Sequence, residues 1–137
     1  MAELKALAER LYDEISNSAT DVDAFIEQYV AQDFVEHEAL PGMDETRETS
    51  RQMFKMMRAA FPDFRMHVED LIQEGDKVVA RITVTGTHKG EFMGVPASGN
   101  EIDVSLIDII RFRDDKMFEH WGVMDMAALM EQMGVTG

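Results

Sequence analysis

The chain has 137 residues, of which 45% are hydrophobic and 29% charged, a balance typical of a globular protein with one domain spanning residues 1–137. Its formal net charge of −14 disfavours nucleic acid and anionic membrane surfaces as partners. Cysteine is absent, which excludes disulfides, thiol catalysis and thiolate metal sites.

The N-terminal half has the spacing of helices. Its first residues carry no signal-peptide pattern and no apolar segment is long enough to cross a bilayer, so we expect a cytoplasmic protein. Apolar residues recur at helical spacing over residues 2–18 and predict an amphipathic helix. A second, short helix can begin at Asp21 or Asp23 and include Tyr29, and a third can begin at Thr46 and end at Pro62.

After Pro62 the apolar residues alternate, which is typical of strands. The first alternation begins at Phe64, and three more predicted strands cover Val78–His88, Ile102–Arg113 and Met117–Val123. A glycine-rich connection of residues 89–100 separates the second and third strands, and residues 125–133 return to helical spacing. This order predicts an α+β fold, in which N-terminal helices pack on one face of a curved antiparallel sheet of at least four strands.

Polar side chains share strand faces with apolar residues at two places. Asp108 lies on the face that carries Leu106 and Ile110, and His88 continues the apolar face that begins at Val78. A carboxylate among apolar neighbours has a raised pKa unless it is paired, and a raised pKa suits a general acid or base. The alternative is structural: Asp108 can form a buried ion pair with an arginine or a histidine.

The last predicted strand brings further candidates. Phe118 and His120 share one of its faces, and Trp121 lies on the other. Asp125 follows the strand, where it can lie at a pocket rim or simply cap the last helix. We expect Asp108, Asp125, His88 and His120 to converge on one pocket in which at least one carboxylate has a raised pKa.

Several familiar motifs are absent from the sequence. No spacing matches a zinc helix site, a phosphate loop, a dinucleotide fingerprint or a nucleophile elbow. The simplest chemistry for the chain is therefore acid/base catalysis without cofactor or metal.

Seven segments, in order along nearly the whole chain, carry a recognisable pattern: residues 34–37, Pro41-Gly42, and residues 60–63, 74–78, 86–94, 107–112 and 119–125. This series resembles the SnoaL-like polyketide cyclase (ester cyclase) family of the NTF2-like superfamily. The resemblance implies a cone of helices around a curved sheet, a deep pocket and a homodimer or higher oligomer. It also implies ring closure by intramolecular aldol condensation, without metal or cofactor.

The resemblance also implies roles for particular residues. An aspartate near the C-terminal end of the sheet serves as acid/base in the characterised cyclases, and Asp125 matches it, with Asp108 and His120 as neighbours. In the expected mechanism this carboxylate removes a proton from a polyketide-type substrate, and the enolate attacks a second carbonyl. A histidine donates a hydrogen bond to the enolate oxygen, and the candidates are His37, His88 and His120. Predicted apolar walls come from the methionines and from Phe34, Phe54, Phe92 and Trp121.

Two other functions fit the residue types. A hydrolase of the limonene-epoxide type needs two carboxylates and an arginine, which Asp108, Asp125 and Arg111 could supply, although Arg111 falls on the opposite strand face from Asp108. A protein that only binds an apolar ligand is the third possibility. For assembly, Ser105, Ile107 and Ile109 form a second, partly apolar strand face, which predicts a homodimer through the sheet.

Overall fold

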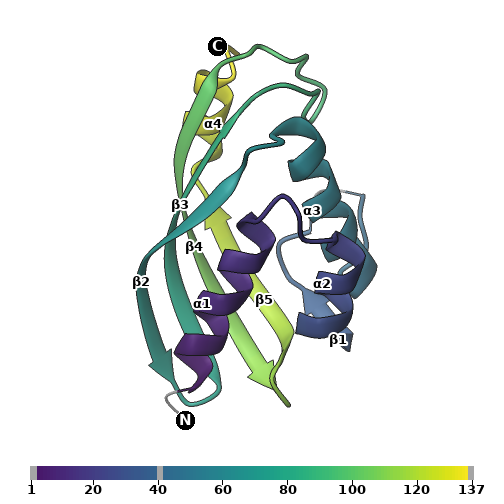
Figure 1. Ribbon diagram of the computed structural model, residues 1–137, viewed down its shortest axis with the longest axis vertical. Helices are drawn as coiled ribbons and strands as arrows, with labels where there is room; N and C mark the ends of the chain where they lie inside the picture. The colour runs from purple at the N-terminus through teal and green to yellow at the C-terminus, as the bar shows by residue number, and fades with distance from the viewer. Residues whose placement is uncertain (1–2, 40–41, 136–137) are drawn as a thin grey trace.

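The computed structural model describes residues 3–39 and 42–135, which form four helices and one five-stranded sheet (Figure 1). Pro41 of the expected turn lies outside the described residues. The helices are α1 (Glu3–Ser16), α2 (Val22–Tyr29), α3 (Arg47–Ala60) and α4 (Met126–Gln132). The strands are β1 (Val30–Glu36), β2 (Arg65–Glu74), β3 (Lys77–Thr87), β4 (Glu101–Arg113) and β5 (Lys116–Met124).

The sheet has the strand order β1-β5-β4-β3-β2. Strands β2 to β5 pair antiparallel with their neighbours, as predicted, whereas β1 pairs parallel with β5. The sheet is therefore mixed, and β1 was missed by the sequence analysis. Adjacent Val30 and Ala31 are both buried and the pairing register shifts before Val35, so this strand lacks the regular alternation that reveals the others.

Helices α1, α2 and α3 all lie on one face of the sheet (Figure 1). The inward face of β3 consists of Val78, Ala80, Ile82 and Val84, each at most 1% exposed. It packs toward the apolar stripe of α1, which includes Leu11 and Ile15. The three N-terminal helices and the alternating strands thus form the predicted α+β architecture around one hydrophobic core.

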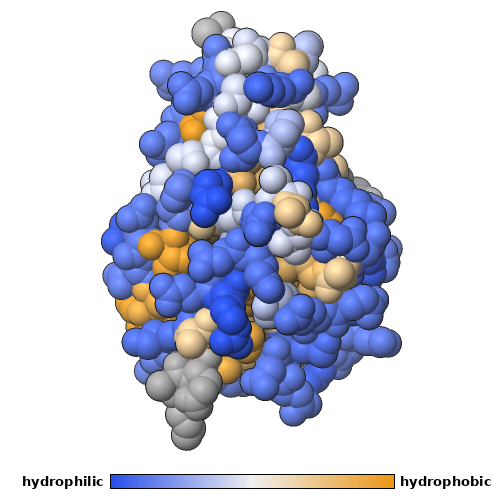
Figure 2. Space-filling view, viewed as in Figure 1, coloured by the Kyte–Doolittle hydropathy of each residue, from blue (hydrophilic) through white to orange (hydrophobic). Residues whose placement is uncertain are grey.

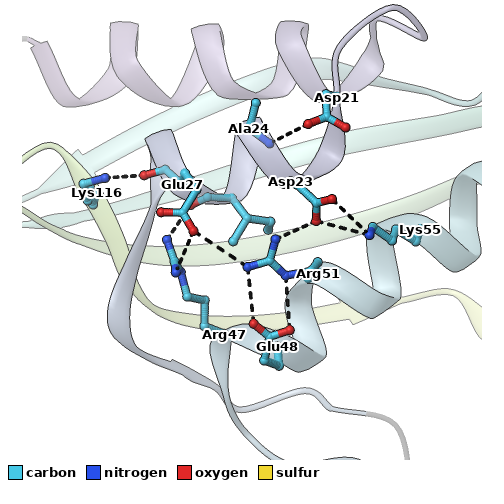
Figure 3. A network of polar contacts seen from close by, with 10 residues as sticks. Asp21, Asp23, Ala24, Glu27, Arg47, Glu48, Arg51, Lys55 and Lys116 are labelled. Atoms are coloured by element: carbon cyan, nitrogen blue, oxygen red, sulfur yellow. Dashed lines mark hydrogen bonds and ion pairs between the residues drawn. The ribbon is translucent and has the colours of Figure 1, made fainter.

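A network of ion pairs joins α2 to α3 at the surface (Figure 3). The guanidinium of Arg51 on α3 contacts Asp23 of α2 at 2.6 Å, and Lys55 reaches the same carboxylate at 3.1 Å. Arg47 pairs with Glu27 at 3.2 Å. These contacts join one side of α3 to α2, while Phe54 and Met57 of α3 pack against the hydrophobic core.

The end of the molecule opposite the N-terminus carries α4 and the long connection between β3 and β4 (Figure 1). This connection is attached to the end of α3, because the backbone N–H groups of Lys89 and Gly90 donate to the carbonyl of Ala60. A side chain at Gly90 would approach the Ala59 carbonyl oxygen to 2.4 Å, so this close contact requires glycine.

The face seen in Figure 2 is mostly hydrophilic, and apolar side chains reach it in separate patches. Across the described ranges, we find no helix that is both long and apolar enough to span a membrane.

Candidate functional site

A cavity of about 530 Å³ lies between the helices and the sheet. Its walls come from α1, α3, α4, all five strands and the β3–β4 connection, and they are mainly apolar. Met93 and Met126 line it and are 40% and 36% exposed, so this side of the cavity is open to solvent. A mostly apolar cavity of this size suits a small organic ligand.

Asp108 and His120 lie in the cavity wall because of the register between β4 and β5. Asp108 is paired with Gly122, and His120 is paired with Ile110, one step along the same face. A Cβ atom on Gly122 would lie 2.6 Å from Asp108 Oδ1 and 3.0 Å from His120 Nε2. The absence of a side chain at Gly122 therefore allows the imidazole to reach the carboxylate diagonally across the strands.

Four side chains from four elements form a continuous chain of hydrogen bonds. The hydroxyl of Tyr12, on α1, donates to Asp108 Oδ2 at 2.7 Å. His120 Nε2–H donates to Asp108 Oδ1 at 2.7 Å, and His120 Nδ1–H donates to Glu36 Oε2 at 2.6 Å. Because ionised carboxylates only accept hydrogen bonds, both nitrogens of this imidazole carry a proton and the ring is positively charged.

The charges of this cluster explain the protonation of His120. Burial by itself lowers the pKa of His120, but the carboxylates of Asp108 and Glu36 outweigh it and raise that pKa to about 10. Burial, together with the adjacent Asp108, raises the pKa of the Tyr12 hydroxyl well above its ordinary value. The raised pKa values thus belong to an imidazole and a phenol, and a raised carboxylate pKa stays a prediction.

Tyr12, Glu36 and Gly122 were not singled out in the sequence. Tyr12 follows Leu11 and lies one helical turn from both Ala8 and Ile15, which are buried, so helical spacing could have placed it inward. Glu36 lies two residues after the buried Phe34, on the same strand face, but this signal requires the strand β1 to be known. No local signal identifies Gly122, because its importance arises from the pairing of β4 with β5.

Asp125 does not lie among the cavity-lining residues, contrary to the expected convergence. It is exposed, and its carboxylate accepts the N–H of Ala128 at 3.0 Å as the N-cap of α4. The chain turns into α4 immediately after β5, and this turn directs the side chain toward the helix instead of the cavity. The structural alternative considered for Asp125 is therefore the one observed.

His88 is fully buried but also lies outside the cavity lining. Its Nδ1 accepts the N–H of Ser98 at 3.2 Å and contacts the Ser98 hydroxyl at 2.9 Å. Its ring packs against Phe61 with 5.4 Å between centroids. The expected convergence is thus wrong for His88, because the β3–β4 connection folds back over the end of β3 and encloses this ring.

His37 and Trp121 stack on each other outside the cavity lining, with ring centroids 4.6 Å apart. His37 Nε2 also contacts Glu119 at 2.9 Å, and Glu119 pairs with Arg111. The prediction that Trp121 forms a cavity wall is therefore wrong, and His37, a candidate hydrogen-bond donor to the enolate, lies outside the lining as well. The indole of Trp121 lies on the opposite face of β5 from His120, as strand alternation predicted. His37 directly follows β1, and its ring stacks on this indole.

Phe118 does not share the strand face of His120. The register between β4 and β5 shifts next to it, because Glu119 pairs with Arg111 while Met117 pairs with Phe112. This bulge places the ring of Phe118 beside the guanidinium groups of Arg111 and Arg113, at 4.9 and 4.7 Å from the ring centroid.

The predicted apolar walls are observed at Phe34, Phe54 and Phe92, which all line the cavity. Eight of the twelve methionines of the chain line it as well: Met53, Met56, Met57, Met66, Met93, Met117, Met124 and Met126. Methionine is flexible and polarisable, so such walls can adapt to the flat or irregular shape of a ligand.

The cavity contains few charged groups. Apart from His120, its ionisable lining residues within the described part of the chain are Tyr12, Glu36, Glu38 and Asp108, and no lysine or arginine is among them. Over the same residues, no set of three or more histidine, aspartate or glutamate side chains is arranged to hold a metal ion. The arrangement is suited to moving a proton at the buried, polar end of an apolar cavity.

Comparison with known protein families supports the resemblance to SnoaL-like polyketide cyclases that the sequence motifs indicated. The family model described as SnoaL-like polyketide cyclase matches residues 6–133. The chain belongs to this family. The SnoaL-like match begins within α1 and runs through α4, and it includes all four members of the hydrogen-bonded cluster.

Three solved structures have the same fold as this chain. TsrD from Streptomyces laurentii superposes with a TM-score of 0.85 and 27% identity, over 98% of this chain and 97% of that one. AclR from Streptomyces galilaeus, which carries a provisional hydroxylase assignment, gives a TM-score of 0.85 and 32% identity over 100% and 88%. IdmH from Streptomyces antibioticus, provisionally a polyketide cyclase, gives a TM-score of 0.80 and 30% identity over 96% and 98%. Among curated proteins, no sequence matches the chain significantly.

Proposed function

We propose that this SnoaL-like protein binds a polyketide-type ligand in the cavity and closes a ring in it by intramolecular aldol condensation. One observation carries the proposal: a hydrogen-bonded carboxylate–imidazolium pair, Asp108 and His120, lies in the wall of an otherwise apolar cavity. Such a pair can accept a proton from a bound ligand and return it.

In the proposed reaction, Asp108 removes a proton from a carbon between two carbonyl groups of the ligand. The resulting enolate carbon attacks a second carbonyl of the same molecule and forms the new carbon–carbon bond. The alkoxide produced takes the proton back from Asp108, so no proton is gained or lost overall. The positive charge of His120 favours the enolate over its neutral precursor, and the walls hold the linear ligand in a cyclisation-ready shape.

Proton transfer can be tested without knowing the natural substrate. The probe is 2-tetralone, an apolar bicyclic ketone, and the measurement is deuterium incorporation at its acidic carbon in D₂O by NMR, with the enzyme-free rate subtracted. We expect Asp108→Asn to reduce the catalysed rate by about 10²-fold or more, since it removes the base while keeping a similar shape. Binding of the ketone, measured by calorimetry, should persist.

Asp125→Asn is the matched control for this experiment. Asparagine caps a helix about as well as aspartate, so the exchange rate and the stability should be nearly unchanged. Full activity of Asp108→Asn with loss of activity in Asp125→Asn would transfer the catalytic role to Asp125. Binding without exchange in the unmodified protein would support the third alternative, a ligand-binding protein.

A hydroxylase is a second candidate function, because AclR, with its provisional hydroxylase assignment, is 32% identical over the whole chain. The two reactions differ in product mass: cyclisation gives an isomer or its dehydrated form, whereas hydroxylation adds one oxygen. The epoxide hydrolase has less support, since Arg111 pairs with Asp76 and Glu119 and lies, like Asp125, outside the cavity lining.

We also propose that two copies of the chain associate through the sheet face that the helices leave uncovered. Cross-strand pairing places Ile72, Val79, Ile109 and Trp121 in one row across β2, β3, β4 and β5. Ile107 and Val123 are paired beside this row and are 48% and 74% exposed. A second copy would cover this apolar surface with an identical one. The cytoplasmic location stays a prediction.

A further inference from the structure

We propose that Glu36 is a positioning residue of the site: it holds His120 as an imidazolium whose Nε2–H is directed at Asp108. This inference rests on the proposed function for its catalytic consequence. The role in positioning is itself a property of the resting protein and can be measured without a substrate.

Glu36 is built into the site from the edge of the sheet. Its pairing partner across β1 and β5 is His120 itself, and the residue is 4% exposed. The carboxylate oxygen Oε2 accepts two hydrogen bonds, from His120 Nδ1–H at 2.6 Å and from the backbone N–H of Glu38 at 3.1 Å. The second bond fixes the carboxylate, so the position of the imidazole is set from this side.

The consequence for His120 follows from counting donors. A neutral imidazole has one N–H and could donate either to Glu36 or to Asp108, leaving a ring nitrogen lone pair against a carboxylate on the other side. Only the imidazolium satisfies both contacts. The groups that face it are Glu36 from β1 and Asp108 from β4, while Tyr12 from α1 faces the far oxygen of Asp108.

This arrangement divides the roles within the site. Both N–H groups of His120 are occupied, and the ring does not act as the base while it stays protonated. Asp108 is then the base, and His120 is its permanent counter-charge. Without Glu36, a single carboxylate would have to hold the charge on a half-buried imidazole whose desolvation opposes it.

The test is an NMR titration of the chain's four histidines from pH 6 to 10.5, with ¹⁵N labelling to report the protonation of each ring nitrogen. In the unmodified protein we expect both nitrogens of His120 to stay protonated at pH 8. Glu36→Gln keeps a hydrogen-bond acceptor but removes the charge, so the pKa of His120 should fall by about 1 to 3 pH units. Glu36→Asp, which retains the charge, should recover part of the difference.

Glu119→Gln is the matched control, because Glu119 makes the same kind of contact to His37, at 2.9 Å. It should leave the titration of His120 unchanged. The proposal is overturned if a ring nitrogen of His120 is unprotonated at pH 8 in the unmodified protein, or if Glu36→Gln leaves its pKa unchanged. The first of these results is measured on the unmodified protein. The proposal can therefore be tested even if the Glu36→Gln variant fails to fold.

The catalytic consequence is tested with 2-tetralone exchange between pH 6 and 9. The rate of Glu36→Gln should decline with rising pH as its His120 loses the proton, while the unmodified protein and Glu119→Gln show no such decline. A lowered pKa of His120 without this decline would overturn the catalytic part. If the unmodified protein does not catalyse exchange, the proposed function fails, and the titration alone still decides whether Glu36 holds the imidazolium.

Discussion

The half-buried imidazolium of His120 lies in an environment far from that of an isolated side chain. Its contacts to Glu36 and Asp108 are among the shortest ion pairs of the described chain, and its own side chain is 20% exposed. Breaking a buried pair by removing one partner is costly, because the other charge is left without compensation. The cluster therefore couples the stability of the fold to the protonation of one ring.

This coupling predicts a definite pH dependence of stability. The folded-state pKa of His120, about 10, is above the ordinary value of 6.5, so the folded protein holds a proton that the unfolded chain releases. The stabilisation is fully present below pH 6.5 and is lost as the pH rises through 10. The free energy of unfolding should fall by roughly 1 kcal/mol per pH unit in this window.

Urea unfolding at pH 6.5, 8 and 9.5 measures this slope. His67→Gln is a suitable control, since His67 is exposed and contacts only the Thr85 hydroxyl among the described hydrogen bonds, so it should retain the slope. Equal stability at the three pH values would contradict a protonated His120 in the folded state.

At the scale of elements, the cavity depends on how α1 and α3 are held over the sheet. Arg58 of α3 donates to the carbonyls of Ile15 and Asn17 at 3.0 and 2.8 Å and also contacts that of Thr20. These carbonyls lie at the end of α1 and just after it, where no intrahelical donor remains. One side chain of α3 therefore completes the C-terminus of α1.

Arg58→Ala should lower the free energy of unfolding by about 1 to 3 kcal/mol, because the part-buried carbonyls of Ile15 and Thr20 lose this donor. Arg51→Ala is the comparison: its partners Asp23 and Glu48 are 52% and 66% exposed, and surface ion pairs contribute about 0 to 1 kcal/mol (Figure 3). Urea unfolding of both variants measures the difference. An effect of Arg51→Ala equal to that of Arg58→Ala would show that the surface network, and not the capping of α1, holds α3.

At the scale of the whole molecule, the two faces of the sheet differ in what covers them. Helices α1 to α3 cover the cavity face (Figure 1), whereas the row through Ile109 and Trp121 on the other face has no covering element among the described residues. The amount of apolar surface exposed there is the physical reason for the proposed dimer.

We expect the unmodified protein to sediment as a dimer. Ile107→Glu places a charge in the middle of the proposed interface and should yield monomers of unchanged secondary structure. Gln52→Glu adds the same charge on the exposed side of α3 and should leave the dimer intact. A monomer at all practical concentrations of the unmodified protein would contradict the dimer.

Local patterns in the sequence were sufficient for most of the fold. The stripe of α1, the alternation along β3 and β4 and the change at Pro62 each depend on neighbours a few residues apart, and these elements formed as predicted. Strand β1 was not predicted, because its buried and exposed residues do not alternate regularly. Its parallel partner β5 also lies more than eighty residues further along the chain.

The site was only partly predictable for the same reason. That Asp108 faces inward follows from strand alternation, but its contacts come from Tyr12 on α1 and His120 on β5, and Glu36 joins through β1. Asp125 has the local sequence context of both a cap and a pocket residue, and the direction in which the chain leaves β5 decides between them. Sequence periodicity determines which side of an element a residue faces, whereas only strand register and helix packing determine which side chains from distant segments meet there.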